Sequence, residues 1–240
     1  MGYSSIISEI HAPIDQNISV MIQPKTLTFL RQLKRNNNKP WFDAHKDRYL
    51  EAKADFEALT ERLIAGLGKN DPALEALRVK DCVFRIYKDV RFSHDKTPYK
   101  VHLAAGFNRG GKKVHYPGYY FHLEPGGNTY CGGGIWHPDA PELKKIRQEI
   151  DYNHDEFLSI IRNRKFLRLF GPLEDEDALM RPPQGYQEDN AAIAYLKFRN
   201  YIAGTAFGDE ILTTPALTKK ILDAFSTLKP LIDFLGRALE

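Results

Sequence analysis

Residues 118–133 read GYYFHLEPGGNTYCGG and carry the clearest fold signal in this chain. Aromatic and β-branched residues, which are enriched in strands, mark 118–124 and 128–133 as two strands. Between them, Pro125-Gly126-Gly127-Asn128 has the composition of a tight hairpin turn. Because so short a connection joins neighbouring strands that run in opposite directions, this stretch predicts an antiparallel sheet.

Working outward, two more strands are expected upstream of the hairpin, at residues 83–92 and 99–107. Residues 191–201 fit a helix and a strand equally well. Helical periodicity surrounds this centre in four segments: from Pro24 to the asparagines at 36–38, from Pro40 to Gly68, from Asp139 or Pro141 to about Ile161, and from an N-cap at Thr214 to about Leu239. The fold class is therefore α+β: a single domain over residues 24–240, with a central antiparallel sheet packed with helices, after an N-terminal arm at residues 1–23.

Composition places the chain among globular proteins. Its 240 residues are 42% hydrophobic and 27% charged, with a net charge of +3. Cys82 and Cys131 form no CxxC pair, so neither a disulfide framework nor a zinc knuckle is indicated. Since no Lys or Arg precedes Lys25 and no apolar run approaches the length of a membrane span, we expect a cytoplasmic protein without a membrane partner.

The run at 83–92 separates into two faces when it is read as a strand. Residues 78–113 as a whole carry ten Lys or Arg against three Asp, a local excess that attracts phosphates or carboxylates. One face of the run is apolar apart from Lys88, and the other is polar. The apolar face holds Phe84, Ile86, Val90 and Phe92, and the polar face holds Arg85, Tyr87, Asp89 and Arg91.

This polar face is the first candidate binding site. A carboxylate at Asp89 between Arg85 and Arg91 would hold both guanidinium groups in place and leave N–H donors for an anionic ligand. Asp95 and Lys96, in the turn that follows, extend the same cluster of charges. The alternative interpretation is a structural network of ion pairs that only holds the sheet together.

Candidate proton carriers follow in the next strands. Tyr99 and His102 open the strand at 99–107, and His122 lies in the strand at 118–124. A neutral histidine near the arginines could act as a general base, although packed histidines give the same pattern. No HxH or HExxH spacing is present, so the sequence predicts neither a metal site nor a cofactor.

Two further segments could approach the same ligand. The glycines before Trp136, with Gly133 at their centre, suit a close backbone approach to a ligand, or a tight crossing at the edge of the sheet. Trp41 and His45 lie four residues apart on a helix start and could face the same cleft, or belong to an ordinary capped amphipathic helix.

Taken together, these motifs resemble the DUF2461 family of uncharacterised bacterial proteins. The resemblance covers about residues 24–238, and the chain departs from the family pattern at Lys88, where arginine is usual, and at 189–191, where Asp-His-Pro is common. It implies a single α+β domain and transfers no activity. The matching segments are NKPWF at 38–42 with His45, Lys46 and Tyr49, then Arg85, DVRF at 89–92, Asp95-Lys96 and PYK at 98–100, then GGG at 132–134 with Trp136 and Pro138.

The sequence thus favours a protein that binds a small anionic, phosphate-bearing ligand or substrate. The expected cleft is formed by Arg85, Arg91, Lys96 and the segment 132–136, and enzymatic activity is left open. Two alternatives stay in view: a nucleic-acid-binding module, and a structural or partner-binding domain whose ion pairs are purely structural. The sequence does not indicate an oligomeric state.

Overall fold

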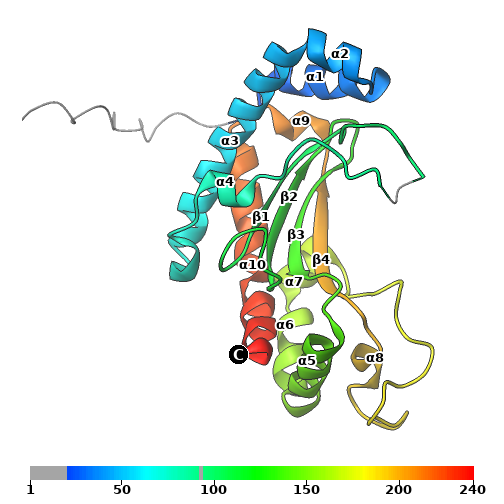
Figure 1. The fold of residues 1–240 in the computed structure, drawn as a ribbon. Coiled ribbons are helices and arrows are strands. Elements are labelled where there is room, and N and C mark those ends of the chain that lie inside the picture. The colour runs from blue at the N-terminus through cyan, green and yellow to red at the C-terminus, as the bar shows by residue number, and fades with distance from the viewer. Residues whose placement is uncertain (1–20, 92–93) are drawn as a thin grey trace, which may run out of the picture.

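The computed structural model describes residues 21–91 and 94–240, and its centre is a four-stranded antiparallel sheet (Figure 1). The strands lie in the order in which they occur along the chain, and the α+β class is confirmed. The two strands of the quoted hairpin are also confirmed. The strands are β1 (Leu103–Phe107), β2 (Gly118–Leu123), β3 (Thr129–Ile135) and β4 (Tyr201–Phe207).

The fourth strand begins at the last residue of the segment whose pattern was ambiguous and extends beyond that segment. Residues 191–201 contain one helical turn, α8 (Ile193–Leu196), and then enter β4. The chain crosses from β3 to β4 through a group of helices at one end of the sheet, yet β4 pairs antiparallel with β3 along its whole length. These crossover helices are α5 (Ala140–Tyr152), α6 (His154–Ile161) and α7 (Arg164–Phe170).

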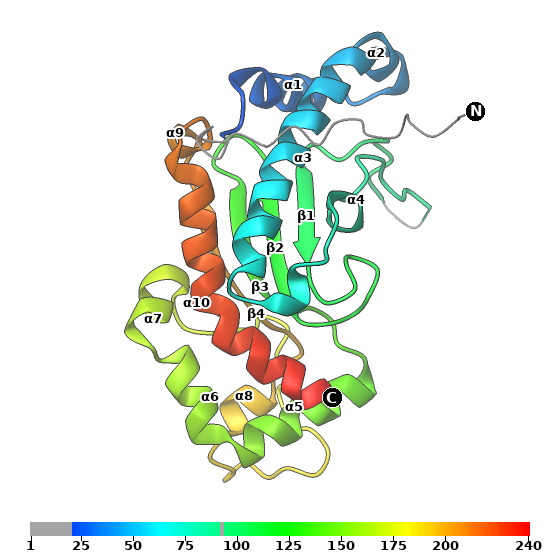
Figure 2. The same cartoon turned by 90° about the vertical axis from the view of Figure 1, so that its left-hand side faces the viewer.

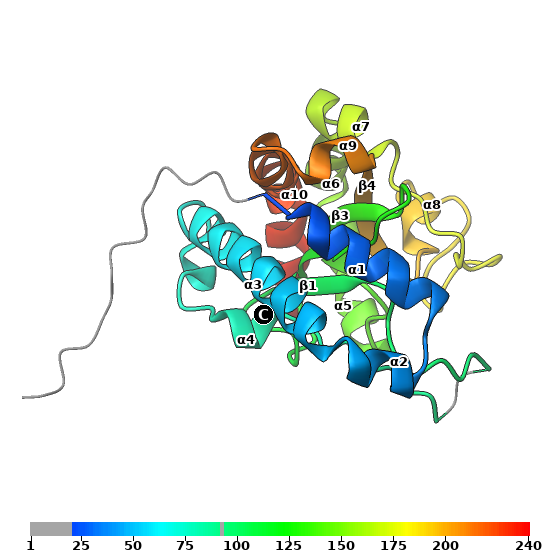
Figure 3. The same cartoon turned by 90° about the horizontal axis from the view of Figure 1, so that it is seen from above.

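Two long helices, α3 (Lys46–Gly68) and α10 (Ala216–Leu239), cover one face of the sheet (Figure 2). Phe121 stacks on Phe56 of α3 with ring centroids 6.0 Å apart, and Tyr119 meets Phe225 of α10 at 5.0 Å. Seen from above, the sheet lies against these helices on one side only (Figure 3). On the opposite face, part of the surface of β3 and β4 stays exposed.

The predicted helices are present, and two of them are interrupted. The helix from Pro24 is confirmed as α1 (Pro24–Arg35), whereas 40–68 divides at His45 into α2 (Lys39–Ala44) and α3. The segment 139–161 divides in the same way at Asn153 into α5 and α6. The last helix starts at Ala216 with Pro215 as N-cap, because the Thr214 hydroxyl donates to Ile211 O instead of capping. Three short elements complete the chain: η1 (Pro72–Leu74), α4 (Val79–Cys82) and α9 (Asp209–Leu212).

The strand predicted at 83–92 is wrong. Its described residues, 83–91, form two isolated bridges with the next segment, Val83 to Ala105 and Tyr87 to Tyr99, and no continuous ladder. Three residues lie between the bridged positions on one side and five on the other, so the second side bulges and a continuous ladder cannot form. The predicted strand at 99–107 is correspondingly shortened to β1. Phe92, assigned above to the apolar face, lies outside the described residues.

The hairpin turn between β2 and β3 is as predicted. Gly126 and Gly127 both have positive φ, at 95° and 79°, which glycine adopts without a steric penalty. Their N–H groups donate to the carboxylate of Asp209 in α9, which anchors the turn.

Of the predicted N-terminal arm, only residues 21–23 are described, and residues 1–20 lie outside. Within this short part, Ile22 is buried and its N–H donates to Leu212 O. Over the described residues, none of the helices is both long enough and apolar enough to cross a membrane.

Candidate functional site

The segment at 83–91 keeps the predicted alternation even though it is not a strand. Ile86 is buried and Phe84 is partly covered, while Arg85, Asp89 and Arg91 are exposed. The isolated bridges and the hydrogen bond from Lys100 N to Ile86 O hold the segment extended along the edge of β1. Alternating side chains therefore still point in opposite directions.

Asp89 pairs with Arg91 and not with Arg85. The Arg91 guanidinium donates to both carboxylate oxygens, with Nε–Oδ1 at 2.9 Å and Nη2–Oδ2 at 2.7 Å. These side-chain bonds, with a backbone hydrogen bond from Arg91, lower the pKa of Asp89 to about 2. The fork of Arg91 is thus directed at a neighbour in its own segment.

Asp95 and Lys96 close the turn that follows. Asp95 forms an ion pair with Lys88, and this bond and those from Thr97 lower the pKa of Asp95. The Lys96 ammonium donates to Val90 O at 3.0 Å. Both predicted ligand-binding side chains therefore have partners within the same turn.

Arg85 lies apart from these pairs and borders a groove of about 520 Å³ between α3 and the 83–87 segment. No hydrogen bond or ion pair joins its guanidinium to any residue in the described part of the chain. Apolar and aromatic side chains form much of the groove wall, and five cationic groups surround it against the single carboxylate of Glu57. The cations are Lys53, Lys80, Arg85, Lys112 and Lys113.

The positive potential at this groove is only partly neutralised. Lys53 pairs with Glu57 at 3.0 Å, and the Lys112 ammonium donates to Lys80 O. The pKa of nearby Lys100 is lowered, first by burial and then by the charge of Arg85. Such an unbalanced site favours an anion.

Tyr99 is positioned as a packing residue. Its ring is 3% exposed and stacks on Phe42 with centroids 4.0 Å apart. Burial is the main cause of its raised pKa. Tyr99 does not line the Arg85 groove, and its predicted role as a proton carrier is not supported by this placement.

Trp41 of α2 and His45, which directly follows α2, do lie together, as predicted. Their rings stack at 4.2 Å, and the His45 Nδ1 lies 2.8 Å from Trp41 O. Trp41 also stacks on Phe29 of α1. Neither residue borders the Arg85 groove, whose nearest contribution from this region is Tyr49.

The glycine segment and Trp136 lie elsewhere. Gly133 belongs to β3 and faces α10, where an added Cβ would stand 2.7 Å from Gly118 O and 3.3 Å from Leu228. Trp136 is 66% exposed and follows the end of β3 that is opposite to the end where β1 begins. The capping box of Asp139 and Glu142 already occupies the N–H groups of these two residues at the start of α5. The structure therefore does not bring segment 132–136 together with Arg85, Arg91 and Lys96.

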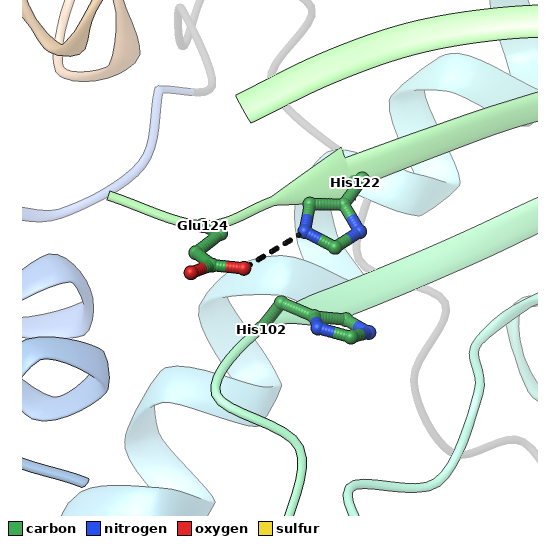
Figure 4. A group of neighbouring side chains, drawn as sticks. All are labelled: His102, His122 and Glu124. Atoms are coloured by element: carbon green, nitrogen blue, oxygen red, sulfur yellow. Dashed lines mark hydrogen bonds and ion pairs between the residues drawn. The ribbon is translucent and has the colours of Figure 1, made fainter. Parts of the chain in front are cut away.

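The structure does bring His102 and His122 together. Their ring centroids are 4.0 Å apart on the sheet face opposite the long helices (Figure 4). Glu124 completes the group, with its Oε2 3.3 Å from His122 Nε2. Burial, and then the neighbouring His122, lower the pKa of His102 to about 4; burial also lowers the pKa of His122.

Sequence reasoning missed the residues that complete this cluster. The Lys34 ammonium pairs with Glu124 Oε1 at 2.9 Å, and the Tyr120 hydroxyl lies 3.4 Å from His122 Nδ1. The spacing of Tyr120, His122 and Glu124 at every second residue of β2 was a usable signal, because it places all three on one face. An open groove of about 680 Å³ runs beside the cluster, bordered by Lys34, His122, Glu124, Tyr130, Gly204 and Ala206 among others.

Comparison with known proteins gives a family and no more. The family model described as "Conserved hypothetical protein (DUF2461)" matches residues 25–234. No curated protein and no solved structure matches the chain.

Proposed function

The chain belongs to the DUF2461 family, and we propose that it binds a small phosphate-bearing anion in the groove beside Arg85. The observation that carries this proposal is the Arg85 guanidinium itself. It borders a groove with an excess of cations and has no ion-pair partner among the described residues. A guanidinium presents N–H donors in a planar fork that matches two oxygens of a phosphate or carboxylate.

The apolar side chains of the groove indicate which class of anion fits it. Val83, Phe84 and Leu103 line it together with two tyrosines. An inorganic ion would leave these side chains uncovered, whereas an anion that carries an aromatic or aliphatic group would bury them. We therefore favour an organic phosphate over inorganic phosphate.

Arg85 and Arg91 have separate roles in this proposal. Arg91 is already in bidentate contact with Asp89, so its removal would leave the groove intact. The cleft predicted from the sequence is thus reduced to Arg85 and its lysine neighbours. Whether a reaction follows binding is not part of the proposal.

Thermal shift and calorimetry with three probes test the proposal: inorganic phosphate, phenyl phosphate and adenosine 5′-monophosphate. A ligand present at 100 times its Kd stabilises a protein by about 2.7 kcal/mol. We expect phenyl phosphate to bind more tightly than inorganic phosphate. Arg85→Ala should weaken binding about tenfold or more, since a hydrogen bond to a charged group contributes about 1.5–3 kcal/mol.

Arg168→Ala is the matched control, because Arg168 is an exposed arginine on α7, outside the groove. It and Arg91→Ala should bind the probes as the wild type does. Absence of any shift, or equal binding by Arg85→Ala, would exclude the proposal. Tighter, steeply salt-dependent binding of a single-stranded oligonucleotide would favour the nucleic-acid alternative. If the Arg85→Ala substitution unfolded the protein, the result would favour the alternative in which the ion pairs are purely structural.

The location of the protein is a further part of this proposal. Cys82 and Cys131 are both buried free thiols, which supports a reducing compartment such as the cytoplasm. Fractionation of cells that produce the full chain would test it, and recovery outside the cytoplasm would contradict it.

A further inference from the structure

We propose that His102, His122 and Glu124 bind one divalent first-row transition-metal ion on the open face of the sheet. Their candidate donor atoms all lie within 4.8 Å of one another (Figure 4). His122 lies in β2, Glu124 directly follows β2, and His102 directly precedes β1. This site is independent of the Arg85 groove.

The register of the sheet explains why three donors converge here. Leu103 pairs with Leu123, so the residues just outside that pair, His102 and Glu124, extend from adjacent strand ends on the same face. His122 lies two residues before Glu124 and therefore shares that face. The spacing of His122 and Glu124 indicates only part of this donor set, since the pairing with a separate strand brings His102 to it.

The donor chemistry fits a transition metal. Two imidazoles and one carboxylate form the ligand set of many catalytic zinc sites and of non-haem iron(II) sites. Donor atoms around a tetrahedral ion with bonds of about 2.1 Å stand about 3.4 Å apart. The His122 Nε2–Glu124 Oε2 distance of 3.3 Å already has this value, and the candidate donor atom of His102 lies within 4.8 Å of both.

Surrounding residues orient the ligands as the outer partners of a metal site do. The Tyr120 hydroxyl engages His122 Nδ1, which leaves Nε2 for the ion. Lys34 holds the second oxygen of Glu124. The buried Thr129 hydroxyl bonds both the N–H and the C=O of Glu124, at 3.1 and 2.9 Å, and fixes its backbone.

The nitrogens of the His102 ring are available to an ion. No hydrogen bond from any residue in ranges 21–91 and 94–240 reaches the ring, and it lies against a second imidazole at 4.0 Å. Two imidazoles that pack together without a shared hydrogen bond gain little from each other's polar atoms. An ion between them would use those nitrogens.

The site has room for further ligands. His122 and Glu124 border the open groove of about 680 Å³, whose wall toward β4 is formed by small residues such as Gly204 and Ala206. Three protein ligands leave at least one coordination position. Water, or an oxygen atom of a ligand held in the groove, would complete the shell.

Metal titration of the full chain tests the inference. Protein stripped with a chelator is titrated with Zn²⁺ by calorimetry and with Co²⁺ by visible absorption. The expected result is one ion per chain and Co²⁺ bands of a low-coordinate site. No saturable binding of either ion would overturn the inference.

Variants locate the ion. His102→Gln and Glu124→Gln should each lower the affinity at least tenfold, whereas His94→Gln and Glu61→Gln, at exposed positions outside the cluster, should not. Tyr120→Phe keeps all three ligands but removes an outer partner, so a loss of about tenfold is expected. Undiminished binding in His102→Gln and Glu124→Gln would show that the ion binds elsewhere.

X-ray absorption on Zn²⁺-loaded wild type provides a measurement that needs no variant. Two imidazoles in the first shell would support the site, and a shell without imidazole would refute it. Arg85→Ala should bind the ion normally, so failure of the phosphate proposal and failure of this one remain distinguishable.

Discussion

The side-chain amide of Asn37 forms two hydrogen bonds with the backbone of Tyr99. Its Nδ2 donates to Tyr99 O at 2.9 Å, and its Oδ1 accepts from Tyr99 N at 3.1 Å. Asn37, which lies between α1 and α2, thereby forms the two backbone hydrogen bonds that a neighbouring strand would form with Tyr99. Together with the stacking of Phe42 on Tyr99, these hydrogen bonds hold the segment around the asparagines at 36–38 against the segment that contains Tyr99.

Asn37→Ala should destabilise the protein by about 1–3 kcal/mol, because it leaves a partly buried N–H and C=O of Tyr99 without partners. Asn37→Asp keeps the acceptor and loses the donor, so an intermediate loss is expected. Urea unfolding followed by circular dichroism measures both. A loss in Asn37→Ala no larger than that in exposed Asn128→Ala would contradict this account.

Substitutions of Tyr99 distinguish a role of its ring in packing from a role of its hydroxyl in proton transfer. Tyr99→Phe preserves the ring that stacks on Phe42 and should leave both stability and phenyl phosphate binding almost unchanged. Tyr99→Ala removes a buried aromatic ring and should cost about 3–5 kcal/mol. If Tyr99→Phe abolished ligand binding while preserving stability, the hydroxyl would have the direct role that the sequence first suggested.

Much of the fold was predictable because its signals are local. The hairpin turn needs glycine at two positive-φ positions, and α1 needs apolar residues on one side only; both requirements are visible in the sequence. The strand β4 was not predicted beyond its first residue, Tyr201, because its residues, YIAGTAF, are mostly small. Its strand state depends on pairing with the glycines of β3, which local sequence does not report.

The site was predicted less well for the same reason. Arg85 and Arg91 appeared to share a face around Asp89, but a side chain two residues away can form a closed pair and leave the other arginine free to face a different groove. The cluster of His102 and Glu124 depends on strand register, and Lys34 arrives from α1. Contacts between distant segments decide both arrangements.

Acid should selectively weaken the anchor of the hairpin turn. Burial alone would raise the pKa of Asp209, but hydrogen bonds from the Gly126 and Gly127 N–H groups and from Arg31 outweigh it and lower the pKa. A carboxylate with a depressed folded-state pKa contributes stability above its unfolded pKa of 3.8, and that contribution is lost as the pH falls through the folded value.

Asp209→Asn should therefore be less stable than wild type at pH 7 by about 1–3 kcal/mol, and the difference should shrink below about pH 4. Denaturant unfolding over a pH series measures it. Asp223→Asn, at an exposed position on α10, is the control and should follow the wild type at every pH. A constant difference between Asp209→Asn and wild type would exclude an electrostatic origin.

Both cysteines should be inert in the folded protein. Burial raises the pKa of Cys82 to about 11 and that of Cys131 to about 12, so almost no thiolate exists at pH 8. A thiol-specific disulfide reagent should react with neither residue in native protein and with both after unfolding. Rapid reaction of a native thiol, traced with the Cys82→Ser and Cys131→Ser variants, would reveal local opening of its surroundings.

The glycines of β3 should tolerate no side chain where the backbone of β4 lies closest to them. Gly134 has φ of 128°, and an added Cβ would stand 1.9 Å from Tyr201 O, a backbone atom that cannot move without shifting β4. Gly134→Ala should therefore cost about 3 kcal/mol or more, from strain and lost pairing together.

Two milder substitutions make this a ranked test. Gly204→Ala places its Cβ 3.2 Å from Cys131 O without a positive φ, and Gly127→Ala meets no atom within 4 Å but keeps a φ of 79°. The left-handed conformation costs the alanine of Gly127→Ala about 1–2 kcal/mol, and Gly204→Ala requires only a small shift of its neighbour. Both variants should therefore fold and lose less stability than Gly134→Ala. Urea unfolding of the three variants measures the order. If Gly134→Ala were as stable as Gly127→Ala, close approach of β4 would not be the reason for glycine at this position, and a requirement for ligand access would regain support.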